Sequence, residues 1–239
     1  MNNIASYIKN KIDRLEPGKI ILFNDLIVPN NQRMAMAKVM SRLVQKGIIN
    51  RLERGKYYKP RKTVFGILKP SEDEILKALL LKNNGYLTGT GAFNQLGLTS
   101  QVTSTIVLAV QDFRPPKEVG GLKIKFRKTP IKVTDKNKTV LQLLDALRYI
   151  KKIPDSTVEE ALKGIINQLQ KLTSDEKNIM LQSALKYNPA IRALTGAIFE
   201  LTCPMFSTDK LFRSLNPLSH YKIGISNDIL PNKTKWKIK

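Results

Sequence analysis

The 239-residue chain has the composition of a folded protein, with 42% hydrophobic and 25% charged residues, which excludes an intrinsically disordered one. Its 41 lysines and arginines outnumber its 19 acidic residues, and the resulting net charge of +22 predicts an anionic partner. Cys203 is the one cysteine of the sequence, so an internal disulfide and a zinc site built on several cysteines are both excluded.

The first residues predict an amphipathic helix rather than an export signal. Four apolar side chains recur there at helical spacing, at Ile4, Ile8, Ile12 and Leu15. Lys9 and Lys11 interrupt the apolar core that a signal peptide needs, and Pro17-Gly18 ends the helix. Since no uncharged apolar stretch reaches the roughly 18 residues of a membrane span, we expect a cytoplasmic protein without a membrane segment.

A second, short helix is expected next, with Asn24 as its N-cap and Asp25 to Val28 in its only turn. Pro29 follows it and begins the turn that leads into the next element.

The segment from Gln32 to Pro60 changes its period from helix to strand. An apolar stripe at Met36, Met40 and Leu43 predicts an amphipathic helix that ends at Gly47. The following residues predict a basic β-hairpin that turns at Gly55. Helices followed by a basic hairpin are typical of the winged helix-turn-helix, in which the last helix enters the DNA major groove and the hairpin, or wing, lies beside the backbone.

This arrangement predicts double-stranded DNA as the partner and provides a set of candidate contacts. On the polar face of the helix and in the wing, the candidates are Gln32, Arg33, Lys38, Ser41, Arg42, Gln45, Arg51, Arg54, Lys56 and Lys59. Arg and Gln can bind guanine and adenine through two hydrogen bonds, whereas Lys and Ser suit phosphates, and the assignment of each side chain stays open. Residues 1–62 carry 14 basic and 4 acidic side chains, a net charge of +10 in about a quarter of the chain.

These patterns predict an α+β protein of two domains. A winged helix-turn-helix domain is expected at residues 1–62, and a larger mixed α/β domain at residues 63–239, helical from about residue 139 and ending in packed helices. In the second domain, strands are expected at 104–110 and 122–126, and capping boxes at Ser71–Glu74, Ser156–Glu159 and Thr173–Glu176. We also expect Trp236 to dock on the fold rather than to lie on a free arm.

The sequence does not indicate an enzyme. A Ser-His-Asp or Cys-His site would need His220 or Cys203, each the sole residue of its type, and His220 beside Pro217 favours a hydrogen-bonded structural histidine. The acidic residues gather at predicted helix starts, where capping explains them. We therefore predict no catalytic residue, no metal ligand and no cofactor.

Three segments together resemble the AbiEi-type antitoxins of bacterial abortive-infection systems, which are grouped as type IV toxin–antitoxin systems. They are the helix-and-wing segment VMSRLVQKGIINRLERGKYYKP, the central GTGAFNQLGLTSQ with the later KIKF strand, and the C-terminal LNPLSHYKIGI followed by LP and Trp236. The three segments occur in the expected order and cover most of the chain.

The resemblance implies a transcriptional autorepressor that is also an antitoxin. Its N-terminal domain would bind inverted repeats upstream of its own operon through the helix and wing residues given above. Its C-terminal domain would neutralise a nucleotidyltransferase-like toxin without forming a stable complex, and no catalytic residue is transferred.

Three alternatives of other kinds stay open. The chain could be a nucleic-acid-processing enzyme with a winged-helix targeting domain, or a general winged-helix transcription regulator. It could also be an RNA- or ribosome-associated adaptor, for which exposed aromatic stacking platforms are expected.

Overall fold

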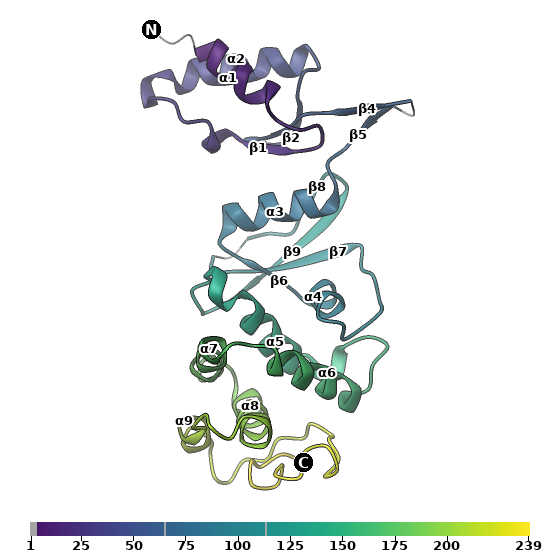
Figure 1. The fold of residues 1–239 in the computed structure, drawn as a ribbon, viewed down its shortest axis with the longest axis vertical. Helices are drawn as coiled ribbons and strands as arrows, with labels where there is room; N and C mark the ends of the chain where they lie inside the picture. The colour runs from purple at the N-terminus through teal and green to yellow at the C-terminus, as the bar shows by residue number, and fades with distance from the viewer. Residues whose placement is uncertain (1–3, 65, 113) are drawn as a thin grey trace. The chain divides into compact units, whose positions relative to one another are not determined.

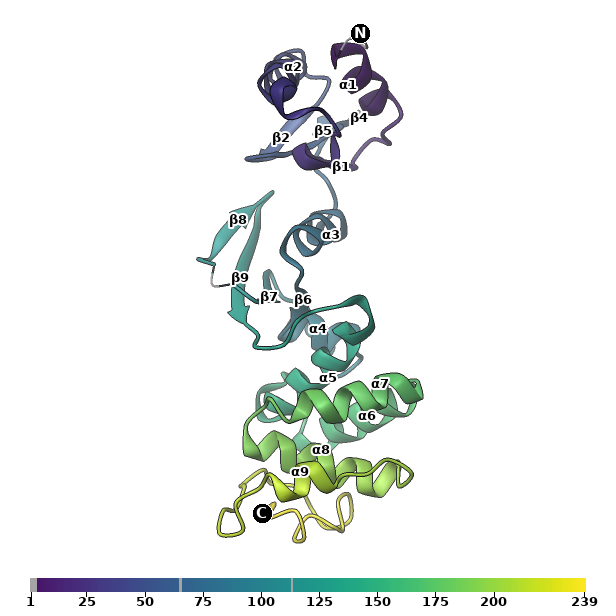
Figure 2. The same ribbon diagram turned by 90° about the vertical axis from the view of Figure 1, so that its left-hand side faces the viewer.

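A computed structural model of the chain describes residues 4–64, 66–112 and 114–239, and it has the α+β class that the sequence predicts (Figure 1, Figure 2). The chain forms two compact units, one of Met1–Asn83 with Lys117–Lys123 and the other of Asn84–Pro116 with Ile124–Lys239. Among the described residues, no helix is long and apolar enough to cross a membrane.

The first unit packs helices against a small antiparallel sheet. Helices α1 (Ile4–Asp13) and α2 (Arg33–Gln45) contact each other, and the sheet has the strand order β1-β3-β2. Its strands are β1 (Ile20–Leu22), β2 (Asn50–Glu53) and β3 (Lys56–Tyr58). The hairpin of β2 and β3 turns at Gly55, whose φ of +76° suits glycine, as the sequence predicts.

The predicted stripe of α2 faces the core of this unit. Met36, Met40 and Leu43 are buried together with Ile8 and Ile12 of α1, Ile21 of β1, and Leu26 and Ile49 outside these elements. The helix ends as expected, because Gly47 has a φ of +66° and the Ile48 amide donates to the Leu43 carbonyl at 3.0 Å. The two surfaces of α2 are therefore fixed by its apolar spacing.

The prediction of a helix at Asp25 to Val28 is wrong. Two single 3₁₀ turns stand in its place, η1 (Phe23–Asp25) and η2 (Asn30–Gln32). Asp25 Oδ2 accepts from the Leu22 amide at 3.2 Å, so Asp25 holds the turn from its end, whereas Asn24 was expected to cap it. Pro29 also disfavours a helical conformation at Val28, which limits the segment to a short turn.

The first unit extends beyond the predicted boundary at residue 62. Strands β4 (Arg61–Thr63) and β5 (Gly66–Leu68) form a second hairpin, and helix α3 (Glu72–Asn83) follows. Ile75 of α3 is buried, and Glu74 forms an ion pair with Lys19 at 3.1 Å. Gly120 belongs to this unit as well. It lies close to the side chains of Ile75 and Leu52, which a Cβ added at this position would meet at 2.6 and 3.3 Å.

The central sheet has four strands in the order β6-β7-β9-β8. They are β6 (Tyr86–Thr88), β7 (Thr105–Val110), β8 (Lys117–Val119) and β9 (Leu122–Lys128), and β7 and β9 confirm the two strands predicted in this region. Helix α4 (Thr90–Gln95) joins β6 to β7 and ends before Gly97, whose φ is +70°.

Helices predominate from residue 138 to residue 213, as the sequence predicts from about residue 139, and a segment without helices follows to residue 239. The helices are α5 (Lys138–Arg148), α6 (Val158–Gln170), α7 (Ser174–Ala184), α8 (Pro189–Thr202) and α9 (Asp209–Arg213), with 3₁₀ turns η3 (Asp135–Asn137) and η4 (Ile150–Lys152). Helix α5 contacts α6, α7 and α8, and most of its residues are buried. It is the centre of this bundle.

The capping predictions for the second domain are confirmed in full at α7, in part at α3, where the Glu74 carboxylate pairs with Lys19, and with a shift of one residue at α6. Thr173 and Glu176 form the predicted capping box of α7, and Ser71 Oγ accepts from the Glu74 amide at the start of α3. At α6 the box is Thr157 and Glu160, one residue later than predicted. Glu159 instead accepts from the Ser226 amide at 3.1 Å, a distant partner that local spacing cannot indicate.

Trp236 docks on the second unit as expected, fully buried against α8 and α9. Its Nε1 donates to Glu200 Oε2 at 2.9 Å, and its ring packs edge-on against Phe212 with 5.3 Å between centroids. Gly196 lies beneath the ring, where an added Cβ would be 2.1 Å from two ring atoms. The glycine is thus required by the tryptophan and not by the helix.

We predict that Gly196→Ala destabilises the protein by about 2 kcal/mol, the usual cost of overpacking a core. A helical Gly→Ala change otherwise stabilises by roughly 1 kcal/mol, so the sign is diagnostic. Urea denaturation followed by the fluorescence of Trp236 measures the change. The control compares Trp236→Leu with Trp236→Leu/Gly196→Ala, and their unfolding is followed by circular dichroism. Without the tryptophan ring, Gly196→Ala should no longer lower the free energy of unfolding. An unchanged or raised stability of Gly196→Ala alone would contradict this packing.

Candidate nucleic-acid interface

The face of α2 opposite the core is exposed and carries the predicted contact residues. All six that lie on or beside this helix are exposed: Gln32, Arg33, Lys38, Ser41, Arg42 and Gln45. The helix itself contains three basic residues and no acidic one. Its outward face therefore presents positive charge and hydrogen-bonding groups without a competing carboxylate from the same helix.

Arg33 is held in place at the start of this face. Its Nη2 donates to Asn24 Oδ1 at 2.9 Å, a bond between the η1 turn and the first residue of α2. The remaining guanidinium donors of an arginine held by one such bond are still available to a base edge or a phosphate.

Met34 and Lys46 extend the same face, and sequence reasoning missed both. The side chain of Met34 is 78% exposed although it is apolar, and Lys46 is exposed just after the end of α2. Met34 lies two residues before Met36 and so falls outside the buried stripe of the helix. This spacing could have identified Met34 as an exposed apolar residue. An apolar side chain on such a face can contact the methyl group of thymine.

The β2–β3 hairpin and the residues just after it, which the sequence predicts to be a wing, have two of their four predicted contact residues exposed. Arg51 and Arg54 are exposed, and Arg54 lies in the turn of the hairpin. Lys59 is half-buried, and its Nζ donates to the Asp13 carbonyl at 2.9 Å. Its ammonium is thus engaged at the end of α1.

Lys56 is not available for DNA, which corrects its prediction as a contact. The residue is 1% exposed, and its Nζ lies 2.5 Å from Glu53 Oε1. The other oxygen of Glu53 pairs with Lys117 Nζ at 2.7 Å. Lys56 lies on β3, the central strand of the sheet, and Lys117 comes from a segment 61 residues later, so this burial has no local sequence signal.

Glu53 holds these two lysines as a carboxylate. Burial by itself would raise the pKa of Glu53, but the hydrogen bonds and charges of Lys117 and Lys56 outweigh it and hold the pKa below its usual value. The ion-pair cluster of Glu53, Lys56 and Lys117, with Glu53 ionised, therefore stabilises the β2–β3 hairpin next to its turn.

His220 is exposed, and no hydrogen bond of its side chain lies within the described residues. The prediction of a hydrogen-bonded structural histidine is therefore wrong. The residue lies in the irregular segment after α9, where neighbouring Leu218 is also exposed.

The comparisons with known proteins place the chain in a family. A family model described as a family of unknown function, DUF6088, matches residues 7–179, and the chain belongs to this family. No curated protein matches the sequence.

The fold is similar to that in the crystal structure of the RV2827C protein from Mycobacterium tuberculosis. The match has a TM-score of 0.52 and covers 98% of this chain and 90% of that chain, at 11% sequence identity. At this identity the likeness concerns the fold alone.

We predict that Glu53→Gln lowers the free energy of unfolding at pH 7 by about 2 kcal/mol, because two lysines lose a charged acceptor. The lowered pKa of Glu53 means that its contribution is present above its unfolded pKa of about 4.3 and is lost as the pH falls through the folded value. Wild type should therefore lose more stability than Glu53→Gln between pH 7 and pH 3.

Urea denaturation followed by circular dichroism at the two pH values measures this difference. Glu118→Gln, at an exposed position of β8, is the matched control and should behave like wild type at both. Equal pH dependence of wild type and Glu53→Gln would contradict the role of the carboxylate.

Proposed function

We propose that the protein is a DNA-binding transcription regulator whose first unit binds duplex DNA in the manner of a winged helix. The exposed face of α2 would enter the major groove, and the β2–β3 hairpin would lie beside the sugar-phosphate backbone. The observation that carries the proposal is the common exposure of Arg33, Arg42 and Arg54, on elements whose opposite sides form the core.

Charge supports this assignment of the partner. The first 62 residues carry a net charge of +10, and no acidic residue occurs in α2. Glu53, the acidic residue of the wing, is engaged with Lys56 and Lys117 and adds no free negative charge to the surface. Phosphate neutralisation by exposed Lys and Arg supplies affinity that falls steeply with salt.

We predict that Arg33→Ala/Arg42→Ala/Arg54→Ala abolishes specific binding to a duplex carrying the DNA upstream of the protein's own reading frame. Each phosphate contact that is lost should flatten the slope of log K against log salt by roughly 0.9, and each base contact that is lost should cost about 1–3 kcal/mol of discrimination. Fluorescence anisotropy at several salt concentrations, against a shuffled duplex, separates the two effects.

The control variant is Lys9→Ala/Lys11→Ala/Arg14→Ala, which removes the same charge from exposed positions at α1. It should retain the preference for the upstream duplex. If both triple variants weaken binding equally, net charge and not the face of α2 explains the affinity. Unchanged specific binding by the first triple variant would overturn the proposal.

The resemblance to AbiEi-type antitoxins supports a second proposed role, in which the protein counters a nucleotidyltransferase-like toxin encoded next to it. The two roles are separable, because the resemblance assigns DNA binding to the first domain and toxin neutralisation to the rest. Expression of the neighbouring gene alone should arrest growth, and co-expression of the full chain should relieve the arrest. Arg33→Ala/Arg42→Ala/Arg54→Ala should relieve it equally, and failure of the wild-type chain to do so would contradict this role.

A further inference from the structure

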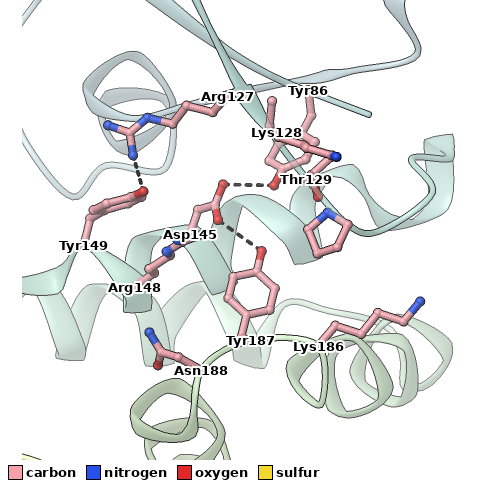
Figure 3. Close-up of a pocket in the computed structure, with 12 residues that line it drawn as sticks. Tyr86, Arg127, Lys128, Thr129, Asp145, Arg148, Tyr149, Lys186, Tyr187 and Asn188 are labelled. Carbon is pink, nitrogen blue, oxygen red and sulfur yellow. Dashed lines mark hydrogen bonds between the residues drawn. The ribbon is translucent and has the colours of Figure 1, made fainter. Parts of the chain in front are cut away.

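The second unit contains a cavity of about 590 Å³ that the DNA-binding proposal does not use (Figure 3). Its walls come from five separate parts of the chain: β6, β7, the end of β9 with the residues after it, the end of α5 with Tyr149, and the loop between α7 and α8. A volume of this size lies within the range of pockets that enclose small ligands.

Asp145 forms the floor of the cavity, and its side chain is almost fully buried. Its Oδ2 accepts from Tyr86 Oη at 2.9 Å and from Thr88 Oγ1 at 2.7 Å, and its Oδ1 accepts from Tyr187 Oη at 3.1 Å. Figure 3 shows both phenol hydroxyls pointing at this carboxylate, that of Tyr86 from above and that of Tyr187 from below. Within the described residues, no lysine or arginine forms an ion pair with it.

The carboxylate of Asp145 can accept one more hydrogen bond. A carboxylate offers about four acceptor positions, and Asp145 uses three, which leaves one on Oδ1 for a donor. Burial, and then the negative charge of Asp145, raise the pKa of Tyr86 and Tyr187, so both phenols remain protonated donors at neutral pH. The floor is thus set up to accept a hydrogen bond from a hydroxyl or amino group.

The rim of the cavity is strongly basic. Four exposed cations line it, Arg127, Lys128, Arg148 and Lys186, against the single carboxylate of Asp145, which leaves an excess of three positive charges. They come from the end of β9, from α5 and from the loop before α8, so the fold and not a local run of sequence brings them together. A ligand that matches this rim carries negative charge.

Tyr149 positions two of these cations. The guanidinium carbons of Arg127 and Arg148 lie 4.6 and 5.5 Å from the centre of its ring, and Arg127 also donates to the Tyr149 hydroxyl. Stacking on an aromatic ring restricts an arginine while leaving donors at its edge, the arrangement in which guanidinium groups bind phosphate best. The mouth of the cavity therefore has two arginines that one aromatic ring restrains.

We propose that this cavity binds a nucleoside phosphate, with the phosphate at Arg127 and Arg148 and a hydroxyl or amino group of the nucleoside donating to Asp145. A cationic ligand suited to the carboxylate alone would meet four positive charges at the rim, and inorganic phosphate would leave the floor unused. The same chemistry is offered by a free nucleotide and by the phosphorylated 5′ end of a nucleic-acid strand.

The test is isothermal titration calorimetry of the full chain with the four ribonucleoside 5′-monophosphates, their nucleosides and inorganic phosphate. At least one monophosphate should bind ten times more tightly than both inorganic phosphate and its own nucleoside. A trinucleotide with and without a 5′ phosphate identifies the source, because a strand end should bind at least as tightly as the best monophosphate only if the cavity accepts strands.

Arg148→Ala/Lys186→Ala removes two exposed rim charges and should weaken monophosphate binding at least tenfold. Lys171→Ala/Lys210→Ala removes two exposed charges of the same unit away from the cavity and should change it less than twofold. Asp145→Asn should weaken the monophosphate tenfold but leave inorganic phosphate unchanged, with the melting temperature recorded to confirm folding.

Two results would overturn the proposal. One is that no monophosphate binds better than inorganic phosphate, and the other is that the rim variant and the control variant bind equally. Neither result bears on binding of DNA by the first unit, so the two proposals fail separately.

Discussion

The apolar contacts of α2 decide which of its surfaces faces outward. Met36, Met40 and Leu43 are buried against α1 and the three-stranded sheet, and each buried side chain of this size contributes about 1.5–3 kcal/mol. A rotation of the helix would expose the stripe and bury Arg42, an unpaired charge, so the observed orientation is strongly favoured. Core packing therefore determines that the basic side of α2 faces outward.

A second constraint fixes the wing relative to the rest of the first unit. The ion-pair cluster of Glu53, Lys56 and Lys117 joins β2, β3 and β8, which returns to the first unit 61 residues after Lys56. This return explains why the first unit does not end at residue 62. It also removes Lys56 from the surface, which leaves the wing with fewer cations than its sequence suggests but with Arg54 still at its tip.

Local spacing was sufficient to predict the parts of this fold that depend on neighbouring residues. The stripe of α2, the stop at Gly47, the turn at Gly55 and the capping box at Thr173 were all correct, because helical period and glycine conformation act over a few positions. The cluster that joins Lys117 to Glu53 beside Lys56 and the cavity around Asp145 were not predictable, since each brings together residues that are tens of positions apart. Tyr86 and Tyr187, for example, meet only at the end of α5.

The proposed function depends on one claim, that the outward face of α2 contacts an anionic partner. Amide chemical shifts of the isotope-labelled full chain, recorded while the upstream duplex is added, test it without any substitution. The claim predicts that the largest changes occur in α2 and at the Arg54-Gly55 turn, with little change around Asp145. Changes concentrated in the second unit, or spread evenly over all basic surfaces, would contradict it.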